Sequence, residues 1–121
     1  MMDCIVVGAG GFIGALCRYL IGLIPVKEGF VFPIKTFVIN IIGSFIIGVI
    51  AAAAAKNPAL NPRLILFLKV GICGGFTTFS SFALETGGLI KDGNGYIGLL
   101  YAGLSVVCGL IAVFAGESVR I

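Results

Sequence analysis

The chain has 121 residues, of which 60% are hydrophobic and only 11% are charged, and its formal net charge is +3. A soluble domain is typically about 45–50% apolar and about 25% charged, so this composition argues against a water-soluble fold and for a bilayer as the solvent. The small, scattered charge gives no basis for nucleic-acid binding, and the lack of histidine removes the commonest general base and metal ligand.

Four apolar runs are long enough for membrane-spanning helices, since a span needs about 20 mostly apolar residues. The first covers residues 5–24, and because no basic segment precedes it, we expect a retained span rather than a signal peptide. The others cover residues 36–55, 64–89 and 95–115, separated by short loops rich in turn-forming residues. The sequence therefore predicts an all-α integral membrane protein in which residues 1–121 form a single transmembrane domain.

Small residues recur at four-residue spacing in three of the four runs. In lipid, such spacing lets helix backbones approach closely. The residues are Gly10, Gly14 and Gly22 in the first run (with Arg18 at the same spacing), Ser44 and Gly48 in the second, and Ser105 and Gly109 in the fourth.

The second run also carries a polar stripe, formed by Thr36, Asn40 and Ser44 at four-residue spacing. An asparagine inside a membrane is costly unless it is paired or functional, and its amide offers donors suited to an anion. Tyr101 and Ser105 align hydroxyl groups on the fourth run in the same way. Hydrogen bonding between helices is the alternative explanation of these stripes.

The third run contains a segment, 71–82, in which glycine, threonine and serine weaken the helix. It is expected to break at mid-membrane, where broken backbone is tolerated only if protein or a watery cavity covers it. Carbonyl groups freed by such a break can coordinate a cation. Phe79 and Phe82 lie beside it, and their positive ring edges could contact a small anion weakly, as conduction requires. A continuous helix with hydroxyl groups bonded to its own backbone is the alternative.

The positive charges are balanced between the two predicted sides of the membrane. One side holds Lys56, Arg63, Arg120 and the nearby Lys69, and the other holds Lys27, Lys35, Lys91 and the nearby Arg18. The positive-inside rule therefore sets no orientation, and we expect insertion in both orientations.

Taken together, these motifs resemble the Fluc (CrcB) family of fluoride channels over nearly the whole chain. The resemblance rests on Gly10-Gly11-x-x-Gly14-Ala15-x-x-Arg18-Tyr19, Asn40-x-x-Gly43-Ser44-Phe45 and, most specifically, Gly71-x-x-Gly74-Gly75-x-Thr77-Thr78-Phe79-Ser80-Ser81-Phe82. The family often has threonine where Ser81 stands, and the hydroxyl group is kept.

This resemblance implies a passive fluoride channel that relieves fluoride toxicity, built as an antiparallel, dual-topology homodimer with two pores. Backbone carbonyls of Gly74 and Thr77 from both subunits would hold a structural Na⁺ at the dimer interface. Phe79 and Phe82 would line the pores beside Asn40. Further polar lining would come from Ser81, Thr36, Tyr101 and Ser105, while Arg18 would lie near a vestibule and Glu85 would influence permeation.

The resemblance also implies a multi-pass protein of a prokaryotic plasma membrane whose partners are fluoride, lipid and a second copy of itself. The main alternative is a small multidrug-type, proton-coupled exporter, which also has four spans. That class carries a glutamate inside its first span, and this chain has none there. An assembly protein would not need the aligned polar stripes. The chain offers no paired acids and no nucleophile with a base, so we do not expect an enzyme.

Overall fold

The computed structural model describes residues 1–27 and 29–120. Within these residues all regular structure is helical. The elements in chain order are α1 (Met2–Gly22), α2 (Ile34–Lys56), α3 (Pro62–Ile65), the π-helical segment η1 (Leu66–Cys73), α4 (Gly74–Phe76), α5 (Ser80–Lys91) and α6 (Gly95–Glu117).

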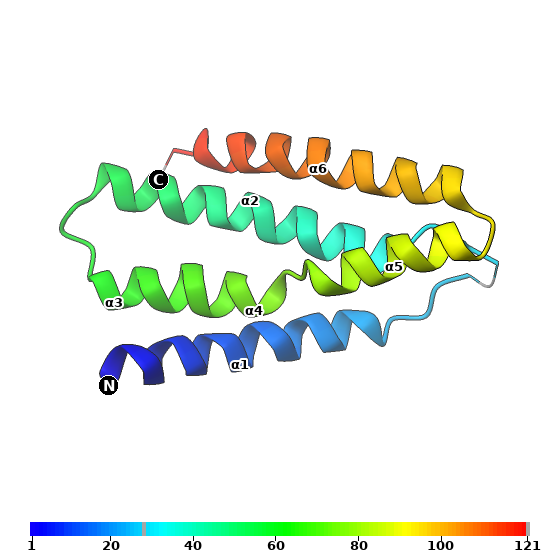
Figure 1. Ribbon diagram of the computed structural model, residues 1–121. Helices are drawn as coiled ribbons and strands as arrows, with labels where there is room; N and C mark the ends of the chain where they lie inside the picture. Colours follow the sequence, from blue (N-terminus) through cyan, green and yellow to red (C-terminus); the bar gives the residue numbers. More distant parts are fainter. Residues whose placement is uncertain (28, 121) are drawn as a thin grey trace.

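Four helical stretches within residues 1–27 and 29–120 are long and apolar enough to cross a membrane, which confirms the four predicted spans. They are Met2–Gly22, Ile34–Lys56, Pro62–Lys91 and Gly95–Glu117. A helix the length of α2 rises about 35 Å, enough for a hydrocarbon core of about 30 Å. The chain passes up and down, so both termini lie at the same end of the bundle (Figure 1).

The ends of the spans follow local sequence signals. Pro33 immediately precedes α2, and Pro62 opens the third span behind Asn61, whose side-chain oxygen accepts a hydrogen bond of 2.9 Å from the Arg63 amide. Between α5 and α6 the chain turns at Gly93, which has a φ of 83° that favours glycine.

α1 packs against the first half of the third span through glycines on both sides. A Cβ added at Gly10 would lie 2.8 Å from Gly71 Cα, and one at Gly75 would lie 3.0 Å from Gly11 Cα. Gly14 meets backbone atoms of Ile72 and Phe76 in the same way. The predicted close approach of α1 is therefore confirmed at Gly10 and Gly14. Gly22 has open space where its Cβ would be, because α1 ends there.

α2 and α6 form the second close pair. Gly48 of α2 faces the Val113 carbonyl of α6, and Gly116 of α6 faces the Phe45 carbonyl of α2. Each helix therefore contributes a glycine that contacts the backbone of the other. Gly109 lies against Ser44, whose Oγ would be 3.7 Å from an added Cβ. The predicted small residues Gly48 and Gly109 thus lie at the contact between α2 and α6.

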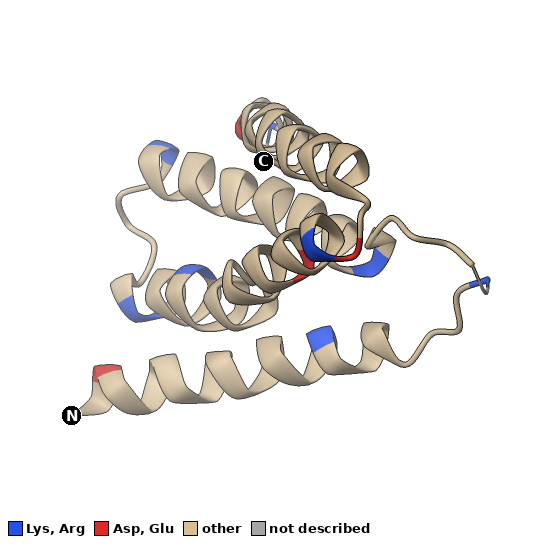
Figure 2. Cartoon of the chain, turned by 45° about the vertical axis from the view of Figure 1, so that its right-hand side comes forward, with Lys and Arg blue, Asp and Glu red and all other residues tan. Residues whose placement is uncertain are grey.

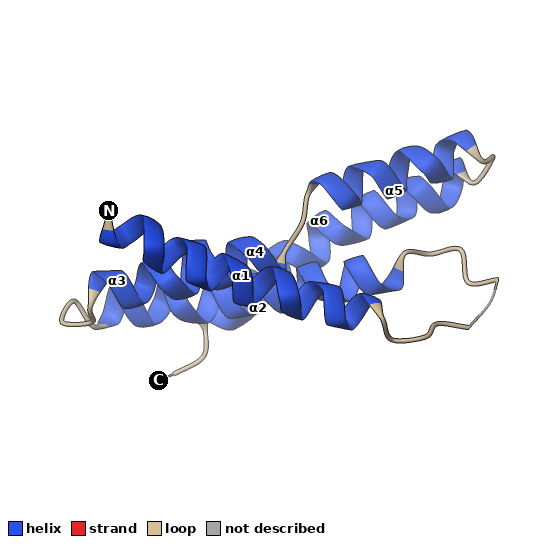
Figure 3. Ribbon diagram, turned by 90° about the horizontal axis from the view of Figure 1, so that it is seen from below, coloured by secondary structure: helices blue, strands red, loops and turns tan. Residues whose placement is uncertain are grey.

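The third span changes its neighbour near its middle. Its first half, α3 to α4, follows α1, whereas α5 diverges from α1 and packs on the beginning of α6 (Figure 3). Gly98 of α6 makes this second contact close, since its Cβ would lie 3.4 Å from the Thr86 carbonyl oxygen.

Large apolar side chains cover the outside of the bundle. Phe12, Leu99 and Phe114 are 71%, 71% and 64% exposed, respectively. A water-soluble protein of this size would bury such side chains, whereas lipid solvates them. The arrangement agrees with a multi-pass membrane protein.

Candidate functional site

The third span is not helical at residues 77–79. α4 ends at Phe76, Thr77 is extended with φ −82° and ψ 159°, and α5 begins at Ser80. The lost helical hydrogen bonds are replaced by side chains from two other spans, and these replacements organise the site.

Asn40 of α2 satisfies the backbone of Thr78 on both sides. Its Nδ2 donates to the Thr78 carbonyl at 3.0 Å, and its Oδ1 accepts from the Thr78 amide at 2.9 Å. Asn40 was predicted as a donor to an anion. The structure places it at the interruption with one side-chain N–H engaged and, because an amide nitrogen carries two, one further N–H remaining.

The carbonyls of Gly74 and Thr77, predicted as ligands of a structural Na⁺, both lose the donors that a continuous helix would supply. The Thr78 amide, which would bond Gly74, donates to Asn40. The Ser81 amide, which would bond Thr77, donates to Thr78 Oγ1 at 3.1 Å. Two oxygens are therefore released from helical bonding within one turn, which fits a hard cation that takes oxygen ligands.

Arg18 of α1 engages a third carbonyl near the interruption. Its Nε donates to the Gly75 oxygen at 3.2 Å. In a continuous helix this oxygen would accept from Phe79, so a charged donor replaces a helical one. The residue predicted to lie near a vestibule thus contacts the broken backbone directly.

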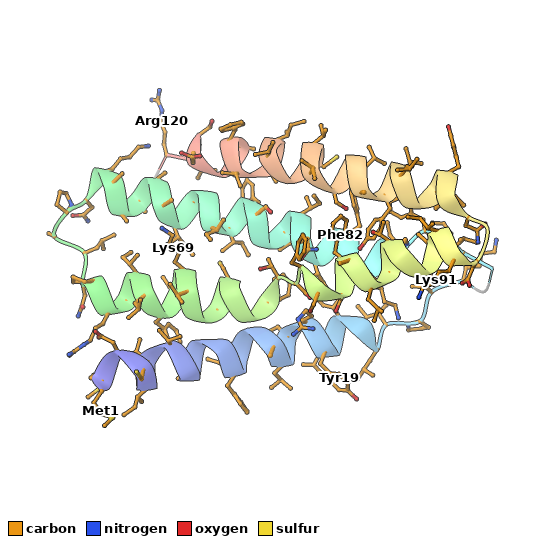
Figure 4. All side chains as sticks on the ribbon, viewed as in Figure 1. Met1, Tyr19, Lys69, Phe82, Lys91 and Arg120 are labelled. Carbon is orange, nitrogen blue, oxygen red and sulfur yellow. The ribbon has the colours of Figure 1, made fainter. Side chains whose placement is uncertain are left out.

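Aromatic rings form a chain beside the interruption. The ring centroids of Phe79 and Phe82 are 5.9 Å apart with planes tilted by 53°, and those of Phe82 and Tyr101 are 5.1 Å apart at 60°. Phe32 continues the chain from Tyr101 at 5.3 Å with an edge-on contact. Figure 4 shows Phe82 projecting from the start of α5 toward α2. Phe79, at 77% exposure, lies at the open end of this chain.

Glu85 of α5 is bound by two hydroxyl groups from neighbouring spans. Thr36 Oγ1 donates to one carboxylate oxygen at 2.8 Å and the Tyr101 hydroxyl donates to the other at 2.8 Å. Tyr101 is fully buried and Thr36 nearly so. Two hydroxyl groups predicted as pore lining are therefore engaged by Glu85, and sequence reasoning missed this three-span contact.

Two grooves meet at Thr78. We call the first, of about 400 Å³, the Phe groove; of the predicted site residues it is lined by Asn40, Gly74, Thr77, Phe79, Phe82 and Ser105. We call the second, of about 350 Å³, the Arg groove; it is lined by the predicted residues Arg18, Thr36, Ser81 and Glu85. Tyr101 lines neither groove and packs behind them.

The grooves are also lined by residues outside the predicted set, among them Thr78 in both grooves, Lys69 in the Phe groove and Lys35 in the Arg groove. The sequence carried one signal for Thr78, since its hydroxyl lies in the segment predicted to break and such hydroxyls bond nearby backbone, here the Ser81 amide. Ser105 was predicted, and among the described residues its buried Oγ is a side-chain oxygen without a hydrogen-bond partner. Since Ser105 belongs to the lining of the Phe groove, that lining includes a hydroxyl group with no hydrogen-bond partner in the described part of the chain.

Comparison with known proteins identifies the family to which the chain belongs. A family model described as CrcB-like protein, Camphor Resistance (CrcB), matches residues 5–117. A protein of Chlorobaculum tepidum named fluoride-specific ion channel FluC is 45% identical over 116 residues, which are 96% of this chain and 92% of that protein.

Two further bacterial relatives carry the same name. The protein of Chlorobium luteolum is 43% identical over 95% of this chain and 89% of its own length. That of Ruminiclostridium cellulolyticum is 42% identical over 97% of this chain and 91% of its own length. Both the family model and these relatives span nearly all of the sequence, so the chain belongs to the CrcB family, a family of membrane channels rather than enzymes.

Proposed function

We propose that this protein is a fluoride-selective passive channel that exports fluoride from the cytoplasm of a bacterial cell. The relatives named fluoride-specific ion channel support fluoride as the ion that passes through the channel. The observation that carries the proposal within this chain is the Phe groove, whose lining combines two tilted phenyl rings with Asn40, which keeps one N–H, and with Ser105, whose buried hydroxyl has no partner among the described residues.

The chemistry of this groove suits a small anion. Phenyl rings have a positive edge, and hydroxyl and amide groups donate hydrogen bonds. Each of these interactions is weak, and conduction requires several weak sites in series rather than one tight one. Hydrogen fluoride is a neutral weak acid that enters from acidic surroundings and ionises inside, so an open path lets the anion leave down its gradient.

The functional unit in this proposal is an antiparallel homodimer with two pores. A single chain would present to lipid the interruption at 77–79 and the amide and hydroxyl groups of the Phe groove, which membranes tolerate only when protein or water covers them. A second copy is the simplest cover. Lysine and arginine lie at both ends of the bundle (Figure 2), so neither orientation is favoured.

A structural Na⁺ at the centre of the dimer belongs to the same proposal. The carbonyls of Gly74 and Thr77 have lost their helical donors, and two copies would supply four such oxygens. The cation would offset the mutual repulsion of these carbonyls and hold the two interruptions together.

The decisive experiment is fluoride efflux from liposomes containing the purified full-length protein, followed with a fluoride electrode and compared with chloride efflux. Rapid efflux of fluoride without chloride, independent of a proton gradient, is the expected result. Absence of fluoride efflux from a well-folded dimer would overturn the proposal, and proton-driven drug uptake by the same vesicles would instead support a multidrug-type exporter.

A further inference from the structure

Lys69 is a positive charge inside the third span with no partner among the described residues. It lies in η1, about 10 Å along the helix from Pro62, and its side chain is exposed. Within the described part of the chain, the one ion pair joins Arg63 to Asp3, and no side-chain hydrogen bond involves Lys69. A charged residue at such a depth is expensive in lipid, so it faces either water or another protein group.

The Phe groove is where this charge lies. Lys69 is the one residue with a formal charge in its lining, and the other polar members are neutral amide and hydroxyl groups. Figure 4 shows the Lys69 side chain projecting from η1 toward α2, the helix that supplies Asn40 and Ser44 to the same groove.

The antiparallel packing of the spans gives the order of residues along the groove. Gly43 lies against the Thr77 side chain and Asn40 bonds Thr78, so these two residues are the part of α2 that lies beside the interruption of the third span. Ile47 is one turn further along α2, on the side of Lys69, and the groove therefore runs from Lys69 to the two phenylalanines.

We propose that Lys69 is an anion-attracting residue at one mouth of the Phe groove, raising the local fluoride concentration ahead of Phe79 and Phe82. This inference rests on the proposed channel function. Clefts with low-dielectric walls and charges of one sign concentrate counter-ions by about 10-fold to 1,000-fold, and a single lysine is expected at the lower end of this range. Lys69 does not need to bind fluoride tightly, which keeps the path open for release.

The test is fluoride efflux at low fluoride concentration from liposomes with Lys69→Gln, Lys69→Arg or the matched control Lys56→Gln. Lys56 ends α2 at the same end of the bundle and lies outside both groove linings. We expect Lys69→Gln to reduce the initial rate about tenfold, within the range for focused charges. Lys69→Arg should recover most of the loss, and Lys56→Gln should match the wild type.

A wild-type rate in Lys69→Gln would overturn the inference while leaving the channel proposal intact. Absence of efflux from the wild-type protein would overturn the channel proposal itself, so the two failures are distinguishable.

A second measurement separates charge from folding. Lys69→Cys is reconstituted, and efflux is compared before and after treatment with a thiol reagent that adds an ammonium group or one that adds a sulfonate. The wild type, with its four native cysteines, is treated in parallel. Recovery by the ammonium reagent and further loss with the sulfonate reagent are expected. Equal effects of the two reagents would contradict a role for charge.

Discussion

Asn40 and Thr78 lie 38 positions apart and exchange two hydrogen bonds, of 3.0 and 2.9 Å, across the interruption of the third span. The Asn40 side chain therefore replaces the two backbone partners that the amide and carbonyl of Thr78 would have in a continuous helix. Because lipid offers no replacement hydrogen bonds, this exchange stabilises the backbone where it leaves the helix at residues 77–79.

Replacing Asn40 by leucine should destabilise the protein and abolish flux. The change leaves the amide and carbonyl of Thr78 without partners, at a cost of about 1–3 kcal/mol for each group. Asn40→Asp keeps the acceptor for the Thr78 amide, but it loses the donor and, when ionised, sets a carboxylate oxygen against the Thr78 carbonyl, so it should also be destabilised and lose flux. Thermal unfolding in detergent, read together with liposome efflux, ranks the three proteins. Equal midpoints for wild type and Asn40→Leu would show that these bonds do not support the interruption.

Replacing Phe79 or Phe82 by isoleucine should reduce fluoride flux at least about tenfold, which corresponds to about 1.4 kcal/mol on the barrier. Isoleucine fills much of the volume but has no positive ring edge. Expression and the dimer peak in gel filtration should remain. Phe12→Ile is the matched control, because Phe12 is 71% exposed and lies outside both groove linings. Normal flux in both groove variants would contradict a fluoride path lined by Phe79 and Phe82.

The four spans could be predicted because hydropathy alone specifies them, and the observed ends differ from the predicted ones by only a few residues. The close approach of α1 was also accessible, since Gly10 and Gly14 carry it through local spacing. Which polar side chains of different spans contact one another could not be predicted from the sequence. Thr36 and Tyr101 were expected to supply polar lining, and nothing in the sequence indicated that their hydroxyls bind Glu85, because helix rotation and neighbour order decide which polar groups meet.

The Glu85 contact predicts non-additive stability. Thr36→Val and Tyr101→Phe each remove one hydroxyl, at about 1 kcal/mol for a hydrogen bond between membrane helices, and the phenylalanine keeps its ring contacts with Phe32 and Phe82. The double variant leaves the carboxylate without either donor, so its loss should exceed the sum of the single losses. A double-mutant cycle on the free energy of unfolding in detergent measures this coupling. Strict additivity would show that Glu85 reaches other donors.

The packing of α1 on the third span predicts opposite effects for two neighbouring glycines. Gly14→Ala places a methyl group against the Ile72 carbonyl and 2.7 Å from the Phe76 amide, so the helices must separate just before the interruption. Overpacking of this kind typically costs about 1–3 kcal/mol, and flux should fall because Arg18, one turn further along α1, moves away from the Gly75 carbonyl. Gly11→Ala meets open space and gains helix propensity, so it should be neutral or stabilising by up to about 1 kcal/mol. Unfolding midpoints and efflux rates of the two variants, measured side by side, test the prediction. Equal unfolding midpoints and efflux rates for Gly14→Ala and Gly11→Ala would contradict the close contact between α1 and the third span.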